Sequence, residues 1–414
     1  MRVLVLNPGS SSLKSSVIES AEIPDGSEPV DLAAPASARA AATPAAALAS
    51  ARAAATPAAA PEPIAQIGVD WGTDATSGGD PADDIRRLIA RYEAQGIALA
   101  SLGAVGYRVV HGGTAFRAPT RVTPDVIAQV TALRDLAPLH NGVAAATMTA
   151  GLAAMPHLPH VAVFDTAFHA TLPEEAYRYP VPDRWFAEWG VRRYGFHGMS
   201  VAWSAERAAL LLGKPVAELR TVVAHLGSGC SVTAVDGGRS VSTSMGLTPL
   251  EGLMMGTRAG SIDPGILFYL LRTGRLDPDQ LAEEMDHQSG LLGVSGRTSD
   301  VRELLRAEAG GDGPATLALN LFTRRAAECI ASAATALPRL DAIVFTGGIG
   351  ENAAGLRARI VARLGAIGVA PIGDDAAPED RVISGPGCSP AILRIEARED
   401  LIVARETARL VARG

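Results

Sequence analysis

Two segments of this 414-residue chain repeat one plan: an apolar run, a turn rich in Gly and Ser, and a second run of β-forming residues. The first segment spans residues 3–18 and turns near Gly9, and the second spans residues 222–235 and turns near Gly227. Each segment predicts a β-hairpin with small residues at its tip. Small residues let backbone N–H groups approach an oxygen-rich ligand. The repeat therefore predicts two related lobes that close on a nucleotide from two sides.

The composition indicates a globular protein whose partners are small molecules. With 48% hydrophobic and 20% charged residues, the chain can bury a sizeable core. Its net charge of −7 argues against binding nucleic acid or an anionic membrane, since both need a basic surface. The apolar run after Arg2 is too short for a signal peptide, and three cysteines without C-x-x-C spacing favour free thiols. We therefore expect a cytoplasmic protein without membrane contact.

Residues from about 20 to 63 are dominated by Ala and Pro and contain a direct repeat. The run that begins at Ser37 recurs from Ser50 to Ala60. Ala buries little area and Pro interrupts long helices, so this composition predicts a flexible insertion between two strands of the first lobe. The alternative interpretation is an arm that binds a partner.

After the insertion, the hydrophobic pattern alternates between the period of a helix and that of a strand. The predicted helices cover residues 83–95, 125–136, 200–212 and 317–337, and the predicted strands cover residues 104–110, 161–164 and 342–345. This alternation predicts an α/β fold. The last strand opens into a Gly-rich turn at 347–352 and a helix to about Leu364, where backbone amides can bind an anion.

Two arginines and two histidines lie in runs rich in Gly and apolar residues. Arg108 and Arg258 lie beside glycines at predicted strand ends. Each can hold a carboxylate or a phosphoryl group through the planar fork of the guanidinium, or form a surface salt bridge. His140 and His197 can donate a hydrogen bond to a developing charge, or they are structural. These side chains make group transfer to or from an anion a candidate chemistry.

Three carboxylates and one lysine complete the candidate site. Asp165 at a strand end, and Glu399 with Asp400 near the C-terminus, can hold Mg²⁺ directly or through water; helix capping is the alternative. Lys14 and Lys214 are the only lysines among 37 basic residues, so the lysine near the first tip indicates a need for an ammonium group there. The G-x-x-x-x-G-K-[ST] loop and the protein-kinase motifs are absent from the sequence, so phosphoryl transfer would need another scaffold.

Taken together, these runs resemble the acetokinase family, which belongs to the acetate and sugar kinase, Hsp70 and actin superfamily of two-lobed ATP-binding folds. The resemblance extends over nearly the whole chain outside the insertion. It rests on eight motifs in order: Asn7–Lys14, Arg108–Gly113, Ala137–Asn141, Val163–His169, Arg192–Gly198, His225–Gly229, Ser242–Arg258 and Gly347–Asn352.

The resemblance implies an actin-like fold with a nucleotide cleft between lobes of the duplicated ribonuclease H type. Residues 1–165 would form the N-terminal lobe. Residues 166–390 would form the C-terminal lobe, which would bind the nucleotide and supply the interface of a homodimer, and residues 391–414 would return to the first lobe. The implied reaction transfers the γ-phosphoryl group of ATP to acetate and gives ADP and acetyl phosphate. The implied metal is Mg²⁺, or Mn²⁺ in its place.

The resemblance also implies a role for each matching residue. The catalytic residues would be Arg108, Asp165, His197 and Arg258, with support from His140. Acetate would be bound by Arg108, and its methyl group would lie in a small apolar pocket formed by Val110, Leu139, Phe196 and Pro249. ATP would be held by Ser10, Ser12, Lys14, His225, Leu226, Gly227, Ser228, Gly229, Asp300, Val301, Arg302, Gly347, Gly348, Ile349, Gly350 and Glu351. Mg²⁺ would be held by Asn7 and Glu399.

The chain departs from the family pattern beside several of these residues. The departures are Tyr107, Gly142, Met199, Val201, Ser228 and Ser261. They leave two alternatives open: a propionate or butyrate kinase on the same fold, or a catalytically impaired actin-like nucleotide-binding protein. A nucleotide clamp alone needs the Gly-rich turns but has no use for Arg108, His197 and Arg258, which favours the kinase.

Overall fold

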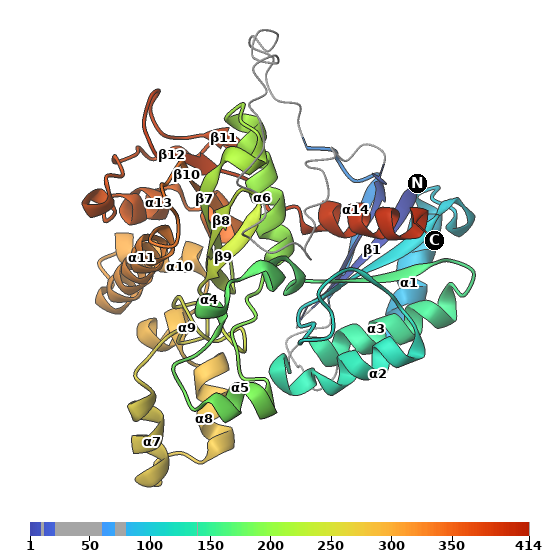
Figure 1. The fold of residues 1–414 in the computed structure, drawn as a ribbon, viewed down its shortest axis with the longest axis horizontal. Helices are drawn as coiled ribbons and strands as arrows, with labels where there is room; N and C mark the ends of the chain where they lie inside the picture. The colour runs from blue at the N-terminus through green and yellow to red at the C-terminus, as the bar shows by residue number, and fades with distance from the viewer. Residues whose placement is uncertain (10–11, 21–59, 71–79, 139, 414) are drawn as a thin grey trace.

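The computed structural model describes residues 1–9, 12–20, 60–70, 80–138 and 140–413, which form two lobes side by side (Figure 1). Each lobe contains a six-stranded sheet with helices packed against it. The predicted two-lobed α/β fold is therefore confirmed. Most of the insertion rich in Ala and Pro, together with Ser10 and Leu139, lies outside the described residues.

The two sheets are built with the same order of strand pairings. The first sheet runs β3-β2-β1-β4-β6-β5 and the second β9-β8-β7-β10-β12-β11. In each of these orders the first, second and third strands pair antiparallel. The third, fourth and fifth strands pair parallel, and the sixth pairs antiparallel with the fifth. The repeat seen in the sequence is thus a repeat of topology.

The first sheet begins with the predicted N-terminal hairpin. Its strands are β1 (Arg2–Pro8), β2 (Ser12–Glu19), β3 (Ala65–Asp70), β4 (Ala104–Val109), β5 (Thr120–Arg121) and β6 (His160–Phe164). The register of β1 and β2 pairs Asn7 with Lys14. β1 is parallel to β4, and β4 is parallel to β6, so these three strands end at one edge of the sheet.

The second sheet contains the other predicted hairpin. Its strands are β7 (Arg220–Leu226), β8 (Cys230–Asp236), β9 (Arg239–Thr243), β10 (Ala342–Thr346), β11 (Arg381–Val382) and β12 (Ala391–Arg394). β7 and β8 pair antiparallel, with His225 opposite Ser231. β7 is also parallel to β10, which brings the end of β10 beside the tip of the hairpin.

Helices cover both faces of each sheet. In the first lobe, α1 (Pro81–Ala94), α2 (Pro124–Ala132) and α3 (Asn141–Ala154) pack together, and α14 (Glu399–Ala412) packs on β1, β4 and β6. In the second lobe, α10 (Val301–Ala309), α11 (Gly313–Ala334) and α13 (Ala354–Val361) share a core, and α6 (Gly198–Leu211) packs on β7 and β10. The shorter helices are α4 (Glu174–Tyr177), α5 (Asp183–Trp189), α7 (Pro264–Arg272), α8 (Pro278–His287), α9 (Gly290–Ser295) and α12 (Gly347–Asn352).

The run at 347–352 differs from its predicted form. We expected a Gly-rich turn before a helix, but α12 begins at Gly347 directly after β10. Gly347 has a φ of 76°, so the chain turns from strand to helix within one residue. Only glycine takes this left-handed conformation without strain, and this explains the difference.

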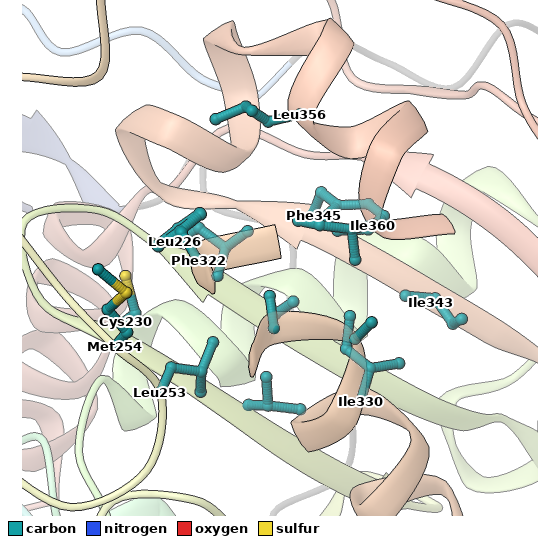
Figure 2. Packing of buried hydrophobic residues seen from close by; sticks show 14 of the residues in the cluster. Leu226, Cys230, Leu253, Met254, Phe322, Ile330, Ile343, Phe345, Leu356 and Ile360 are labelled. Atoms are coloured by element: carbon teal, nitrogen blue, oxygen red, sulfur yellow. The ribbon is translucent and has the colours of Figure 1, made fainter. Parts of the chain in front are cut away.

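Alternating side chains divide the second sheet between two cores. Figure 2 shows Leu226 of β7, Phe322 and Ile330 of α11 and Ile360 of α13 in one cluster on one face. Val222 of β7 belongs to the same cluster. Its neighbour Val223 belongs instead to a second cluster, which includes residues of α6, α14 and the first sheet. Because this second cluster draws residues from both sheets, α6 and α14 form the apolar contact between the lobes.

The chain passes from the first sheet to the second between β6 and β7, and it returns to the first lobe through residues 395–398, the crossover. β12 still pairs with β10 in the second sheet, and α14 lies on the first sheet. The lobe boundaries given above remain a prediction. No helix within the described ranges has the length and apolarity that a bilayer span needs, and the three cysteines are free thiols.

Candidate active site

Arg108 contacts three polar side chains at the edge where β1, β4 and β6 end. Its Nη2 lies 2.8 Å from Oδ2 of Asp165, and its Nε lies 3.1 Å from Oδ1. Nη1 lies 3.5 Å from Oδ1 of Asn7 and 3.6 Å from Oε2 of Glu399. The parallel pairing of β4 and β6 produces this fork, because Arg108 lies near the end of β4 and Asp165 directly follows β6. Asp165 is only 1% exposed, so the ion pair is largely removed from water.

Arg108 and Glu399 each stabilise the charge of the other, whereas burial raises the pKa of Asp165 despite its pairing with Arg108. Burial alone would lower the pKa of Arg108, but Asp165 and Glu399 outweigh it and raise that pKa. For Glu399, burial raises the pKa, and the positive charge of Arg108 and Lys14 together with His225 outweighs burial and lowers it. Arg108 therefore stays a cation and Glu399 an anion near neutral pH.

His197 and His225 form a stacked pair at the second hairpin. Their ring centroids are 4.1 Å apart, with an interplanar angle of 18°. Nδ1 of His197 lies 3.0 Å from Oγ of Ser231, and Nδ1 of His225 lies 2.8 Å from Oγ of Ser200. Burial lowers the pKa of His225 to about 4, and burial together with His225 and Arg108 lowers the pKa of His197 well below its ordinary value. Both rings are neutral at pH 7.

His197 has a left-handed backbone conformation, which is strained for a residue other than glycine. Its φ of 56° is the one positive φ of a non-glycine residue in the described part of the chain. Such conformations cost about 1–3 kcal/mol and concentrate at functional sites. The amide N–H of Gly198 donates to the carbonyl oxygen of Asp165 at 3.1 Å, and a Cβ at this glycine would lie 2.1 Å from that oxygen. Gly198 therefore lets His197 and Asp165 come together at the start of α6.

Arg258 approaches His197 from an irregular segment of the second lobe. The predicted strand end at Arg258 is therefore wrong. Its Nη1 donates to the carbonyl oxygen of Pro249 at 3.0 Å. A Cβ built on Gly229 would lie 3.4 Å from Nη1 of Arg258 and 3.4 Å from Nε2 of His197. The glycine at the hairpin tip thus keeps the space open between two polar groups.

His140 lies at the N-terminus of α3 and faces the same region from the first lobe. Burial, Arg258 and Arg108 lower its pKa to about 4. Its Nδ1 is buried and has no hydrogen-bond partner within the described ranges. Arg108 and Arg258 both lower the pKa of His140 and of His197, so both arginines lie near both histidines.

Three of the residues expected around a methyl group lie in or against the apolar cluster of the second lobe or beside Arg258. Phe196 is buried and Val110 packs against the same apolar cluster of the second lobe. Pro249 contacts Arg258 through its carbonyl group. Leu139 lies outside the described residues, so the predicted pocket is described only in part.

The predicted nucleotide residues lie on three elements near the second hairpin and on the first hairpin. A Cβ on Gly347 would lie 3.1 Å from Nε2 of His225, so α12 starts against the hairpin tip. Gly256 donates to the carbonyl oxygen of Ser228 at 3.1 Å and lies beside Ser299, which precedes α10. Asp300 caps α10, accepting from the amide of Arg302 at 2.8 Å and pairing with its side chain. The first lobe contains a cleft of about 460 Å³, which is lined by Asn7, Lys14, Arg108 and Glu399 among others. Ser12 is half-buried in β2. Ser10 lies outside the described residues.

Asn7 and Glu399 have the chemistry that Mg²⁺ requires. An amide oxygen and an ionised carboxylate are hard ligands, and both lie beside the guanidinium of Arg108. Within the described ranges, three or more His, Cys, Asp or Glu side chains nowhere gather as a metal cluster. Mg²⁺ is commonly bound through one or two protein oxygens, with water and phosphate as its other ligands. The residues present fit that mode of binding.

Sequence reasoning missed the side chains that orient the site. Ser200 and Ser231 fix the two stacked histidines. His111 is fully buried, with Nε2 3.1 Å from the carbonyl oxygen of Leu247 and its ring edge-on to Phe196. Asn141 accepts from the amide of His111 at 3.1 Å. Ser231 alone had a readable signal, because strand alternation places it across the hairpin from His225.

The histidines predict a pH dependence of stability. Burial lowers the pKa of His111 to about 4, from the ordinary value of 6.5, and Nδ1 cannot take a proton while it accepts from the amide of Gly113 at 3.0 Å. Between pH 6.5 and 4 the unfolded chain binds the extra proton, so stability falls as the pH falls through this window. We expect His111→Gln to reduce the pH dependence of the thermal unfolding midpoint between pH 7 and 5. His157→Gln, at an exposed site, should leave it unchanged; equal pH dependence in all three proteins would contradict the assignment.

The fold is actin-like, and the family match makes the chain a phosphotransferase. Two lobes of equal topology meet at a site with two guanidinium groups, neutral imidazoles and an ionised carboxylate. A sequence model of the acetokinase family matches residues 2–405. The chain belongs to the acetokinase family.

Individual relatives agree with this assignment. The acetate kinase of Deinococcus radiodurans is 52% identical over 317 residues, which cover 74% of this chain and 78% of that protein. The acetate kinase of Gloeobacter violaceus is 40% identical over 430 aligned positions, covering 98% of both chains. The crystal structure of a propionate kinase from Francisella tularensis superposes with a TM-score of 0.81 at 34% identity and covers 99% of both chains.

Proposed function

We propose that this chain transfers the γ-phosphoryl group of ATP directly to acetate, giving acetyl phosphate and ADP in a reversible reaction. The observation that carries the proposal is the approach of Arg108 from the first lobe and Arg258 from the second to His197. Acetate is already an anion at neutral pH, so the reaction needs no strong base. It needs cations and hydrogen-bond donors that bring two anions into line and neutralise the transferring oxygens. The free thiols favour a reducing compartment such as the cytoplasm.

In the proposed mechanism each polar side chain has a separate task. Ser231 donates to Nδ1 of His197, which leaves the proton on Nε2, where it can donate to the phosphoryl group in transfer. Arg258 is fixed by Pro249 and neutralises an oxygen of the same group. Asp165 holds Arg108 in place through the fork and leaves Nη1 as a further donor. His140 supports the site as a neutral donor or acceptor.

Mg²⁺ would be held by Asn7 and Glu399, and it would neutralise charge on the phosphate oxygens. Lys14 acts from the opposite strand of the first hairpin, where it pairs with Asn7 in the register. ATP would be held by the two hairpins, the start of α10 and α12. These residues are Ser10, Ser12, Lys14, His225, Leu226, Gly227, Ser228, Gly229, Asp300, Val301, Arg302, Gly347, Gly348, Ile349, Gly350 and, through its backbone only, Glu351.

Propionate is the second candidate acceptor, because the Francisella structure with a TM-score of 0.81 is named a propionate kinase. One methylene group in an apolar pocket is worth only about 1–3 kcal/mol. Because this difference in binding energy is small, we expect acetate and propionate to overlap as substrates.

The departures from the family pattern leave the charged residues in place. Tyr107 is buried and bonds to Nδ1 of His160 at 2.7 Å, so it lies on the other face of β4 from Arg108. Met199 and Val201 are buried in the cluster between the lobes, and Ser261 accepts from the amide of Gly252 at 3.1 Å. Because none of them displaces Arg108, His197 or Arg258, we favour an active kinase over an impaired one.

The proposal is tested by hydroxamate formation from ATP, Mg²⁺ and acetate, propionate or butyrate. We expect product with acetate, and the relative rates define the preferred chain length. Product with none of the three acids, while ATP still binds, would support a nucleotide-binding protein without carboxylate chemistry.

We also propose a homodimer formed through the second lobe. Helix α7 protrudes from this lobe (Figure 1), and none of its residues is buried. Ile266, Phe268 and Tyr269 are 45%, 61% and 51% exposed. Contiguous apolar surface of this kind marks an interaction site. Light scattering should give the mass of two chains, and Phe268→Asp should shift it to one; a monomeric wild type would reject the proposal.

A further inference from the structure

Glu351 connects helix α12 to the segment that joins the lobes. Its Oε1 accepts from the amide of Ala397 at 2.9 Å, and the amide of Gly347, where α12 begins, acts on the same carboxylate. Gly347 in turn lies against His225 at the hairpin tip. One side chain therefore links the proposed nucleotide site to residue 397 of the crossover.

The crossover is held by further groups of the second lobe. The amide of Glu396 donates to Oδ1 of Asp380 at 2.7 Å, and its carbonyl oxygen accepts from Nε1 of Trp203 at 3.0 Å. Arg394 is 4% exposed and lies 3.7 Å from Oε2 of Glu351 and 3.6 Å from Oδ1 of Asp380. Glu351 is thus one end of a buried charge network that fixes the crossover on α12 and α6.

The crossover leads directly to Glu399. Only Arg398 separates Ala397 from Glu399, the first residue of α14, and Glu399 lies 3.6 Å from Nη1 of Arg108. A shift of the backbone at Ala397 must therefore move the Glu399 carboxylate relative to Arg108 and Asn7. Helix α12 contacts His225 through Gly347 and the amide of Ala397 through Glu351. A displacement of α12 would therefore displace Ala397 and, two residues further on, Glu399.

We infer that Glu351 is a positioning residue: its carboxylate holds the interlobe crossover against α12 and thereby sets Glu399 at the metal site. The backbone of α12 contributes to nucleotide binding, and the Glu351 side chain acts on Glu399 instead. This inference rests on the proposed function for the role of Glu399 in holding Mg²⁺. It makes the placement of a metal ligand depend on the helix that receives the nucleotide.

Glu351→Ala and Glu351→Gln separate positioning from nucleotide contact. Alanine removes the acceptor for Ala397, and loss of such an outer partner typically lowers metal affinity or activity by about 10- to 100-fold. We expect the Mg²⁺ concentration for half-maximal activity to rise by about that factor, and the dissociation constant for ADP measured in EDTA to stay unchanged. Glutamine keeps an oxygen acceptor for Ala397 and should restore most of the Mg²⁺ response.

Two outcomes would overturn the inference. Weaker ADP binding in EDTA with an unchanged Mg²⁺ requirement would make the carboxylate a nucleotide ligand, and no change in either quantity would make it irrelevant to the site. Hydrogen exchange of residues 396–402 provides a readout without turnover: the alanine variant should exchange faster there, and the glutamine variant should match the wild type. If the wild type phosphorylates no acid, the proposed function fails, while the exchange measurement still decides whether Glu351 holds the crossover.

Discussion

Replacing Arg258 by alanine lowers kcat/KM for acetate by on the order of 10²- to 10³-fold, because one charged donor to the transferring group is lost. Within the described ranges no carboxylate lies within ion-pair distance of Arg258, so its charge is not neutralised by a neighbour in the site. Its Nη1 is fixed by Pro249 and lies near Nε2 of His197 across Gly229. The loss should appear in kcat, since the charge on the equatorial oxygens is redistributed during transfer.

The fold should tolerate this substitution, because Arg258 has few polar contacts within the protein. Arg86→Ala is the matched control: Arg86 is 65% exposed on α1, pairs with Asp83 and lies outside the site. We expect the hydroxamate assay to show full activity for the control and an unchanged thermal midpoint for both variants. Full activity in Arg258→Ala would contradict the proposed site.

The sequence predicts those parts of the fold that depend on local patterns of apolar residues and glycines. The two hairpins follow from apolar alternation on either side of a Gly-rich turn, and both form as predicted with antiparallel pairing. The helix at 83–95 has its apolar side chains at helical spacing, and α1 covers Pro81–Ala94. The residues that carry charge, such as Arg108 and Asp165, also stood out, because they follow or precede Gly-rich and apolar runs.

The arrangement of the site depends on information that a linear pattern does not contain. The fork between Arg108 and Asp165 joins residues 57 positions apart and requires β4 and β6 to be parallel neighbours. Ser200 reaches His225 only after α6 packs on β7. The contact of Glu351 with Ala397 depends on the path of the crossover between the lobes, which has no signature in either segment.

Replacing Arg108 by glutamine should cost both activity and stability. The side chain of Arg108 is 16% exposed, and that of its partner Asp165 is 1% exposed. Removing one member of a buried ion pair leaves the other charge uncompensated and typically costs about 3–5 kcal/mol in the free energy of unfolding. The same change removes a donor at the site, so we also expect a loss of kcat/KM on the order of 10²-fold or more. Urea unfolding and the hydroxamate assay measure the two effects separately.

A second substitution separates the two effects. In Arg108→Gln with Asp165→Asn, two neutral amides replace the ions, so no buried charge is left without a partner. We expect this double variant to recover much of the free energy of unfolding lost in the single variant and to remain as inactive. If it is instead as unstable as the single variant, the uncompensated charge of Asp165 is not the cause of the instability. If it regains activity, the guanidinium of Arg108 does not act on the substrates, and only Arg258 and His197 remain to neutralise the transferring group.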